Sequence, residues 1–264
     1  MNHVPPARGD AGQDVVGRAV MDAVHDLFVL RDPVRARRHA APGFRTHSVL
    51  PAAGIGPDAL EALVRALPPD FRYVPRRCLV HGDHVFVEGT CHGLADTPLT
   101  CYDLFRTHRG LLAGHGDAVG PVGLLRPASA PGRSQRIPPL PGAAALARDF
   151  VRTVLIAGDH SAADRFLADG ADYHHHDPVH ARELHAPPWT DGPHCCGGAV
   201  RYTRTTLAIA DRQTALVRSR GVIADVPCTL YDLFHIEEGR LAEHRALVTP
   251  EGRLPTPCGP PPPP

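Results

Sequence analysis

Two segments of the sequence carry nearly the same residues, TCYDLF at positions 100–105 and TLYDLF at positions 229–234. Each is followed at the same spacing by glycine, leucine, alanine and histidine: Gly110, Leu112, Ala113 and His115 in the first copy, and Gly239, Leu241, Ala242 and His244 in the second. The offset is 129 positions throughout, as between Tyr102 and Tyr231. Self-similarity at a fixed offset indicates an internal duplication.

The same offset relates residues upstream of these segments. It pairs Ala95, Asp96 and Pro98 with Ala224, Asp225 and Pro227. It also pairs Phe44 with Tyr173 and His47 with His176. Each copy therefore contributes one early histidine, one aspartate in the middle (Asp103 or Asp232) and one late histidine (His115 or His244).

The composition excludes several kinds of partner. The 28 basic and 28 acidic residues give a formal net charge of zero, and neither sign forms a long block. A protein that binds nucleic acid or an anionic membrane usually carries such a block or patch. The sequence also has no apolar leader and no run near the roughly 20 apolar residues that span a bilayer. We therefore expect a cytoplasmic protein that binds a small molecule, with no nucleic acid and no membrane partner.

Two residue types limit the chemistry. All 28 basic residues are arginine, which stays protonated and cannot form the Schiff base that lysine forms. Acid and base catalysis near neutral pH therefore falls to carboxylates and to the 18 histidines. The seven cysteines are an odd number, and Cys78, Cys91 and Cys101 lie in strand-like segments, so we expect free and mostly buried thiols.

Hydrophobic periodicity predicts helices followed by strands in the first copy. Three helices are expected: one from Val16 to Phe28, a short one capped by Asp32 ahead of Pro33, and one from Leu60 to Leu67. Strands are expected at residues 44–49, 72–80, 84–92, 100–106 and 111–119. Helices followed by antiparallel strands form an α+β domain with the helices on one face of the sheet.

The second copy repeats this order with one difference. An apolar helix from Ala147 to Leu155 begins it, but residues 186–198, which are rich in proline and glycine and include Trp189, replace the third helix with a loop. We expect a disordered N-terminus at 1–13, a first domain at 14–120, a Pro/Gly linker at 121–142, a second domain at 143–250 and a Pro-rich tail at 251–264.

The motifs resemble those of the SnoaL-like branch of the NTF2-like superfamily, which includes polyketide cyclases and proteins named as aldol-condensation catalysts. FRTH at 44–47 and YHHHDP at 173–178 are similar to an aromatic-x-x-His-Asn-Pro element. Leu104-Phe105 and Leu233-Phe234, each after an aspartate, are similar to a Val-Asp-Ile-Phe strand, and HGD at 115–117 to a final His-Trp-Asp. The second copy departs from this pattern because Ala246 stands where the first has Asp117.

The resemblance implies two tandem cone-shaped domains, each a curved antiparallel sheet wrapped by two or three helices. It also implies acid and base catalysis without a metal ion or an organic cofactor. Because single-copy members are often dimers, it further implies a monomer whose two copies form an intrachain pseudo-dimer.

The turn between the last two strands decides whether Asp103 and His115 meet. A two-residue loop at Arg109 and Gly110 places their side chains on opposite faces, whereas a three-residue loop sets them directly across from each other. Only the last loop position is glycine in both copies, and neither Arg109 nor Glu238 favours positive φ. We therefore expect the three-residue register, with Cβ atoms about 4.5 to 5.5 Å apart and Asp103 able to orient the imidazole.

Structural interpretations of the same residues stay open. Asp103, Asp232 and the late histidines could instead hold strand hydrogen bonds or pack as structural residues. His47 and His176 are either pocket residues or ordinary strand histidines. Asp117 either shares the face of His115 or is an exposed carboxylate at the strand end.

A histidine-rich segment at residues 174–185, followed by His194, Cys195 and Cys196, invites a metal-site interpretation. Strand alternation sends His174 and His176 to one face and His175 to the other. The spacing also matches no compact zinc signature. We therefore expect no physiological metal and no cofactor.

Two functions follow from these residues. The first is a cyclase, isomerase or dehydratase in which His115, oriented by Asp103, removes a proton next to a carbonyl, while His47 or Asp117 donates to the enolate oxygen. The second is a non-catalytic binding or scaffold protein. Because only the first copy keeps the final carboxylate, the enzyme hypothesis assigns catalysis to that copy, and the second-copy equivalents are His176, Asp232 and His244.

Overall fold

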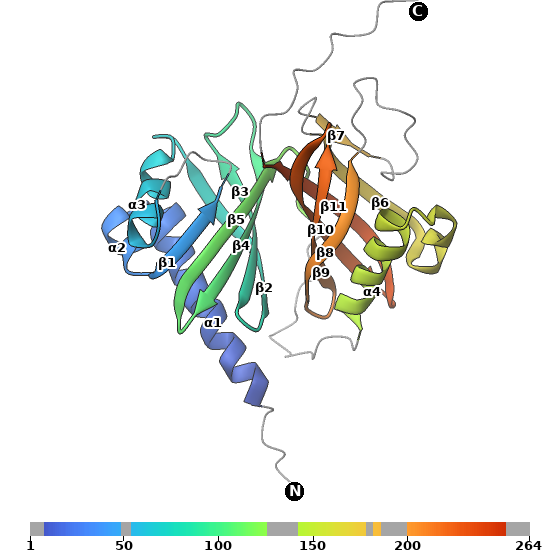
Figure 1. Cartoon of the computed structure of the whole chain (residues 1–264), viewed down its shortest axis with the longest axis horizontal. Helices are drawn as coiled ribbons and strands as arrows, with labels where there is room; N and C mark the ends of the chain where they lie inside the picture. Colours follow the sequence, from blue (N-terminus) through green and yellow to red (C-terminus); the bar gives the residue numbers. More distant parts are fainter. Residues whose placement is uncertain (1–7, 49–53, 126–141, 178–181, 186–199, 252–264) are drawn as a thin grey trace, which may run out of the picture. The chain divides into compact units, whose positions relative to one another are not determined.

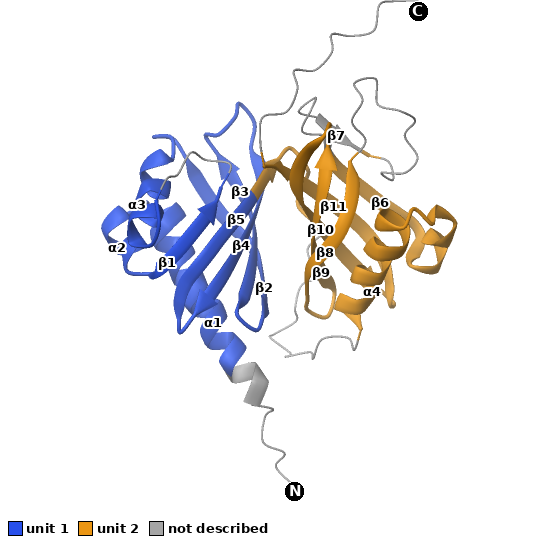
Figure 2. Ribbon diagram, viewed as in Figure 1, with its two compact units in different colours: residues 1–117 blue, residues 118–264 orange. Residues whose placement is uncertain are grey.

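The computed structural model describes residues 8–48, 54–125, 142–177, 182–185 and 200–251 of the chain. The chain divides into two compact units, residues 1–117 and 118–264 (Figure 2). Most of the expected linker, the loop with Trp189 and most of the expected Pro-rich tail lie outside the described residues. The two units correspond to the two copies that the duplication predicts.

The first unit begins with helices and continues into a five-stranded sheet (Figure 1). The helices are α1 (Arg8–Val24), which runs into a π-helical turn η1 (His25–Val29), α2 (Pro33–Arg37) and α3 (Pro57–Ala66). The strands are β1 (Ala40–His47), β2 (Arg72–His81), β3 (His84–His92), β4 (Leu99–His108) and β5 (Leu111–Gly120), in the order β1-β5-β4-β3-β2. The three predicted helices are present, but residues 8–13 are helical rather than part of a disordered lead-in.

The second unit repeats this sheet and adds an edge strand. Its helical elements are α4 (Ala143–Phe150), the π-helical η2 (Val151–Ile156) and the 3-10 helix η3 (His160–Arg165). Its strands are β6 (Leu167–Asp177), β7 (Arg182–Leu184), β8 (Arg201–Ala210), β9 (Thr214–Ile223), β10 (Val226–Glu237) and β11 (Arg240–Pro250), in the order β7-β6-β11-β10-β9-β8. Because β1 pairs parallel with β5, and β6 with β11, both sheets are mixed rather than purely antiparallel.

The periodic apolar residues of the sequence form the core of each unit. In the first, α1 packs against β2 and β3, and Val20, Val24 and Leu27 are fully buried. In the second, α4 packs against β8 and β9, and Phe150 and Val154 are fully buried. Each such side chain contributes about 1.5 to 3 kcal/mol through loss of apolar surface from water. The helices therefore cover equivalent strands in the two copies.

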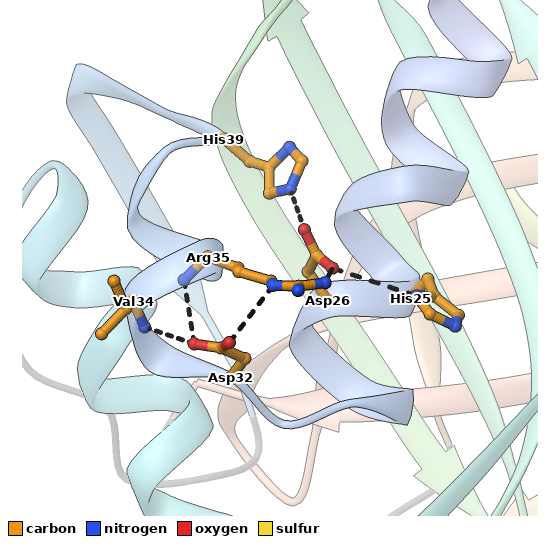
Figure 3. Close-up of polar contacts among 6 residues, drawn as sticks. All are labelled: His25, Asp26, Asp32, Val34, Arg35 and His39. Atoms are coloured by element: carbon orange, nitrogen blue, oxygen red, sulfur yellow. Dashed lines mark hydrogen bonds and ion pairs between the residues drawn. The ribbon is translucent and has the colours of Figure 1, made fainter.

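A capped turn connects the first helix to β1. The Asp32 carboxylate accepts hydrogen bonds from the backbone N–H groups of Val34 and Arg35, as the predicted N-cap requires (Figure 3). His39 Nε2 also lies 2.8 Å from Asp26 Oδ2. Helix α2 therefore begins at the residue that the Asp-Pro pair predicts.

A disulfide between Cys91 and Cys101 corrects the expectation that these cysteines are free thiols. Cys91 on β3 lies opposite Leu99 of β4, so Cys101 is its diagonal neighbour on the same face of the sheet. Their Cα atoms are 6.3 Å apart, within the range that a disulfide bridges. Among the described residues, Cys78 and Cys228 are free. Sequence spacing alone did not reveal that the two cysteines share a face.

Candidate active site

Asp103 on β4 and His115 on β5 form a buried hydrogen-bonded pair in the first domain. His115 Nε2 lies 3.0 Å from Asp103 Oδ1, and the two side chains are 0% and 5% exposed. The second domain repeats the pair with His244 Nε2 at 2.9 Å from Asp232 Oδ1, with side chains 1% and 0% exposed. The structure therefore brings together the middle aspartate and the late histidine of each copy.

The turn that produces these contacts differs from the predicted one. Arg109 and Gly110 have φ values of 51° and 79°, and Glu238 and Gly239 have 49° and 77°. Both positions of each turn are thus left-handed, which is the geometry of a two-residue type I′ loop. The prediction of a three-residue loop was wrong because it assumed that a non-glycine residue would avoid positive φ.

A β-bulge restores the face that a two-residue loop would reverse. In the second domain Ile236 pairs with Leu241, but His235 pairs with Glu243, so one extra residue enters β11. His244 consequently lies opposite Phe234, and Asp232 is its diagonal neighbour on the same face rather than its direct partner. Diagonal neighbours remain within reach of long side chains. The pair meets as expected, but through a different register.

A tyrosine that the sequence analysis did not identify completes each pair. Tyr73 of β2 donates its hydroxyl to Asp103 Oδ2 at 2.6 Å, and Tyr202 of β8 donates to Asp232 Oδ1 at 2.7 Å. Burial, followed by the charge of the adjacent carboxylate, raises the pKa of both tyrosines well above the ordinary value. Both hydroxyls therefore keep their proton and remain donors. The signal was present in the sequence, because Tyr73 and Tyr202 are also 129 positions apart.

In the first domain the outer nitrogen of the imidazole is also occupied. Thr46 Oγ1 of β1 lies 3.0 Å from His115 Nδ1. Because a carboxylate only accepts hydrogen bonds, His115 Nε2 donates to Asp103. Nδ1 accepts from the threonine hydroxyl in the neutral ring and donates to the hydroxyl oxygen in the imidazolium. Nearby, Ser48 donates to Asp117 Oδ2 at 2.5 Å. Each ring nitrogen of His115 thus has a protein partner.

Opposing effects set the charge of His115. Burial alone lowers its pKa, but the hydrogen bond to Asp103 and the charges of Asp117 and Asp103 outweigh burial and raise the pKa above its ordinary value. Phe105 stacks on the ring with centroids 4.7 Å apart, which fixes its orientation. The first domain therefore favours the imidazolium form of its histidine.

The second domain replaces both of the additional polar groups. The sequence offset pairs His175 with Thr46 and Ala246 with Asp117. The strand register differs, however, because Thr46 lies opposite His115, whereas Tyr173 lies opposite His244 and His175 opposite Ala246. The rings of His175 and His244 are perpendicular, with centroids 4.7 Å apart. Within the described part of the chain, His175 Nε2, His244 Nδ1 and Asp232 Oδ2 are buried and have no hydrogen-bond partner.

The early histidines do not join these groups in the way the offset suggested. His47 is exposed and lies on the face of β1 opposite to Thr46, because side chains alternate along a strand. This placement agrees with the alternative of an ordinary strand histidine for His47, whereas its neighbour Thr46 faces His115. The side chain of His176 is outside the described residues, and His175 faces inward at that level of β6.

Asp103, His115 and Asp117 could together hold a metal ion, since one ligand atom from each lies within 4.8 Å of the others. A metal would have to displace the hydrogen bond between His115 and Asp103. The histidine-rich segment forms a different contact, in which His174 Nε2 lies 2.8 Å from Asp172 Oδ2. His180, His194, Cys195 and Cys196 lie outside the described residues.

Comparison with known proteins identifies the family of the first domain. Residues 18–115 match the family model described as a SnoaL-like domain. The first unit is a SnoaL-like domain. The second unit repeats its strand order and its Tyr–Asp–His group, so the chain carries two tandem NTF2-like α+β domains, as predicted. No curated protein matches the chain closely enough to count as a relative.

Three solved structures similar to this chain each cover less than half of it. An NTF2-like protein of unknown function from Mesorhizobium loti is 19% identical, with a TM-score of 0.36, and covers 45% of this chain and 98% of its own. TsrD from Streptomyces laurentii is 21% identical, with a TM-score of 0.34 and coverage of 40% and 89%. An LEH-like epoxide hydrolase from M. tuberculosis is 15% identical, with a TM-score of 0.34 and coverage of 40% and 83%.

None of the helices in the described ranges combines the length and the apolar character needed to cross a bilayer.

Proposed function

We propose that this protein is a cofactor-independent acid–base enzyme, a cyclase, isomerase or dehydratase, that acts on a carbonyl-containing and largely apolar small molecule. The observation that carries the proposal is the buried Tyr–Asp–His chain, assembled in each domain from three strands. A carboxylate held in this way fixes the tautomer of the imidazole and stabilises the imidazolium that forms when the ring takes a proton.

The surroundings of the histidines support an apolar substrate. Phe234 stacks on His244 with centroids 4.3 Å apart, and Phe150 and Tyr173 present their edges at 6.1 and 6.2 Å. Aromatic walls with few polar groups are typical of sites for small apolar molecules. In such a site an imidazole oriented by a carboxylate is suited to remove a proton from carbon next to a carbonyl.

The alternative function, a non-catalytic binding or scaffold protein, is favoured for the first domain by one observation. Both ring nitrogens of His115 have protein partners, and the side chain is fully buried. A histidine satisfied in this way can act as a structural link between β1, β4 and β5. The two functions can therefore coexist in one chain, with one domain in each role.

Proton exchange provides the test. The full chain is incubated in D₂O with a panel of aryl and cyclic ketones, and loss of the α-proton signal is followed by NMR. We expect the wild type to catalyse exchange. The double variant Asp103→Asn/Asp232→Asn should catalyse exchange about 10²- to 10⁴-fold more slowly. Ketones that stabilise the protein thermally but exchange no faster than in buffer would instead identify a binding protein.

A further inference from the structure

Two histidines from adjacent strands meet at the β7 edge of the second sheet (Figure 1). β7 pairs antiparallel with β6, and His175 lies opposite Leu184. One step further along this register sets His185 beside His174, and their rings are perpendicular with centroids 4.7 Å apart. Alternation along β6 keeps consecutive histidines off one face, but it places no limit on a histidine from the neighbouring strand. The fold therefore creates a histidine pair that spacing along the chain does not reveal.

The separation of the two rings suits a shared metal ion. Imidazole nitrogens bind zinc at about 2.0 to 2.1 Å, so two such ligands in a tetrahedral site hold their ring centroids about 5 Å apart. The observed centroid distance of 4.7 Å between His174 and His185 is close to that value. Imidazole is also a preferred ligand of zinc, copper and nickel. The pair can therefore supply two nitrogen ligands to one divalent transition-metal ion.

Asp172 orients His174 as carboxylates orient metal-binding histidines. Its Oδ2 lies 2.8 Å from His174 Nε2, and the two residues share one face of β6 because they are two positions apart. Since a carboxylate only accepts hydrogen bonds, Nε2 of the neutral ring donates and Nδ1 carries the lone pair. A histidine that binds a metal through one nitrogen almost always donates from the other to an acceptor such as a carboxylate. Asp172 thus favours the tautomer in which His174 Nδ1 is a ligand.

The charge and exposure of this edge suit a cation that arrives from solvent. On β11, Glu243 lies opposite Asp172. Arg245 Nε donates to Glu243 Oε1 at 2.6 Å, and Arg245 Nη2 lies 3.8 Å from Asp172 Oδ2. Two carboxylates and one guanidinium give these three side chains a net charge of −1. Asp172 and His185 are exposed, so water can complete the coordination of an ion.

We propose that the second domain binds one divalent transition-metal ion of the zinc class between His174 Nδ1 and a ring nitrogen of His185, with water in the remaining positions. The ion links β6 to β7, a strand of only three residues. Binding energy at such a site adds to the stability of the structure that positions the ligands. The metal therefore holds the edge strand in place. This site is separate from the buried Tyr–Asp–His chain, so the proposal does not depend on the proposed function.

The first domain has no counterpart of this pair among its described residues. The sequence offset places Gly43 and Arg45 where the second copy has Asp172 and His174. β1 is also the edge strand of the first sheet, with no equivalent of β7 beside it in the described part of the chain. The metal site is therefore a property of the second copy.

Titration with zinc tests the proposal. Zinc chloride is added to the metal-free full chain, purified without a histidine tag, and binding is followed by calorimetry. We expect one equivalent of zinc per chain. His174→Gln and His185→Gln each remove a nitrogen ligand and should abolish this binding. His81→Gln is the matched control, because it makes the same change at an exposed strand histidine of the first domain, and it should leave binding unchanged.

A milder variant separates the role of Asp172 from that of the ligands. Asp172→Asn keeps the side-chain shape but removes the charge, and loss of such an outer partner should weaken zinc affinity about 10- to 100-fold. Zinc should also slow hydrogen exchange at the amides of β7 in the wild type but not in His185→Gln. Asp172 and His185 are exposed, so these two variants decide the test even if His174→Gln fails to fold.

Other outcomes would overturn the proposal. Undiminished affinity in both His174→Gln and His185→Gln would show that the pair does not bind the ion. Loss of binding only in Cys195→Ser/Cys196→Ser would assign the ion to those thiols, and loss only in His115→Gln would assign it to the buried group of the first domain. No zinc uptake, or uptake of several equivalents with equal affinity, would show an adventitious ion only.

Discussion

The two domains bury the same Tyr–Asp–His chain but complete it with different residues. In the first, Thr46 occupies the free nitrogen of His115, and Asp117 adds a second negative charge. In the second, alanine replaces the aspartate, Tyr173 is the residue opposite His244, and the corresponding nitrogen of His244 stays unpartnered among the described residues. The strand scaffold and the orienting carboxylate are thus common to both copies, while the surroundings of the second ring nitrogen differ.

The largest expected effect separates the two domains kinetically. His244→Ala should lower ketone exchange by about 10² to 10⁴, because it removes the available base, whereas His115→Ala should act mainly on stability. If the Asp117 carboxylate, which only the first copy retains, is required for exchange, His115→Ala should instead cause the larger loss of exchange rate. Initial rates of both variants at 25 °C, with folding checked by circular dichroism, decide between the two. A greater loss in His115→Ala would show that the carboxylate matters more than the open nitrogen.

The pH dependence of stability should have opposite signs in the two domains. The raised pKa of His115 stabilises the folded state fully below the unfolded value of 6.5, and this contribution is lost as pH rises through the folded pKa. The lowered pKa of His175 stabilises above 6.5, and this contribution is lost as pH falls towards the folded pKa.

Denaturant unfolding between pH 5 and about 8 checks these signs. Wild type is compared with His115→Gln and His175→Gln, each of which removes one titrating ring. The stability difference between wild type and His115→Gln should shrink as pH rises, and that for His175→Gln should shrink as pH falls. Parallel curves for all three proteins would exclude both contributions.

The sequence predicted the strands and the duplication because their signals are local or repeated. Alternating and periodic apolar residues located both sheets and the main helices, and the constant offset located the second copy. The register between the last two strands was not predictable in the same way. It depends on positive φ at Arg109 and Glu238 and on a bulge near His235, and neither feature has a residue type that demands it.

The site residues divide along the same line. Asp103 and His115 were identified because they stand in the repeated motif, and Tyr73 was overlooked because its strand lacks one. His47 was chosen over Thr46 because histidine is the more reactive type, but strand alternation decides which side chain faces inward. Contacts between distant strands therefore need the fold, even where each residue is visible in the sequence.

The disulfide should produce a smaller difference in stability between the domains. Among the described residues, only the first domain contains one. The positions equivalent to Cys91 and Cys101 are Arg220 and Leu230. Closing a loop of sequence separation 10 stabilises the folded state by about 2 to 3 kcal/mol. Cys91→Ser/Cys101→Ser should therefore lose about that amount, and only the first-domain amides should exchange faster with solvent. Thiol titration of unfolded, unreduced wild type giving all seven cysteines free would refute the bond.

The smallest expected difference concerns the two tyrosines. Tyr73 is the donor to Asp103 Oδ2, while His115 binds Oδ1, so Tyr73→Phe leaves a buried carboxylate oxygen without its donor and should cost about 1 to 3 kcal/mol. Tyr202 and His244 share Asp232 Oδ1. Tyr202→Phe therefore leaves that oxygen hydrogen-bonded, and its cost should lie near the lower limit, at about 0.5 to 1.5 kcal/mol.

Urea unfolding of both variants measures this difference. Each Tyr→Phe substitution keeps the aromatic ring and removes only the hydroxyl, so packing losses cancel to first order. A deficit in Tyr202→Phe as large as that in Tyr73→Phe would mean that the two carboxylates are held equivalently, and the contrast between the domains would then rest on the second ring nitrogens of His115 and His244 alone.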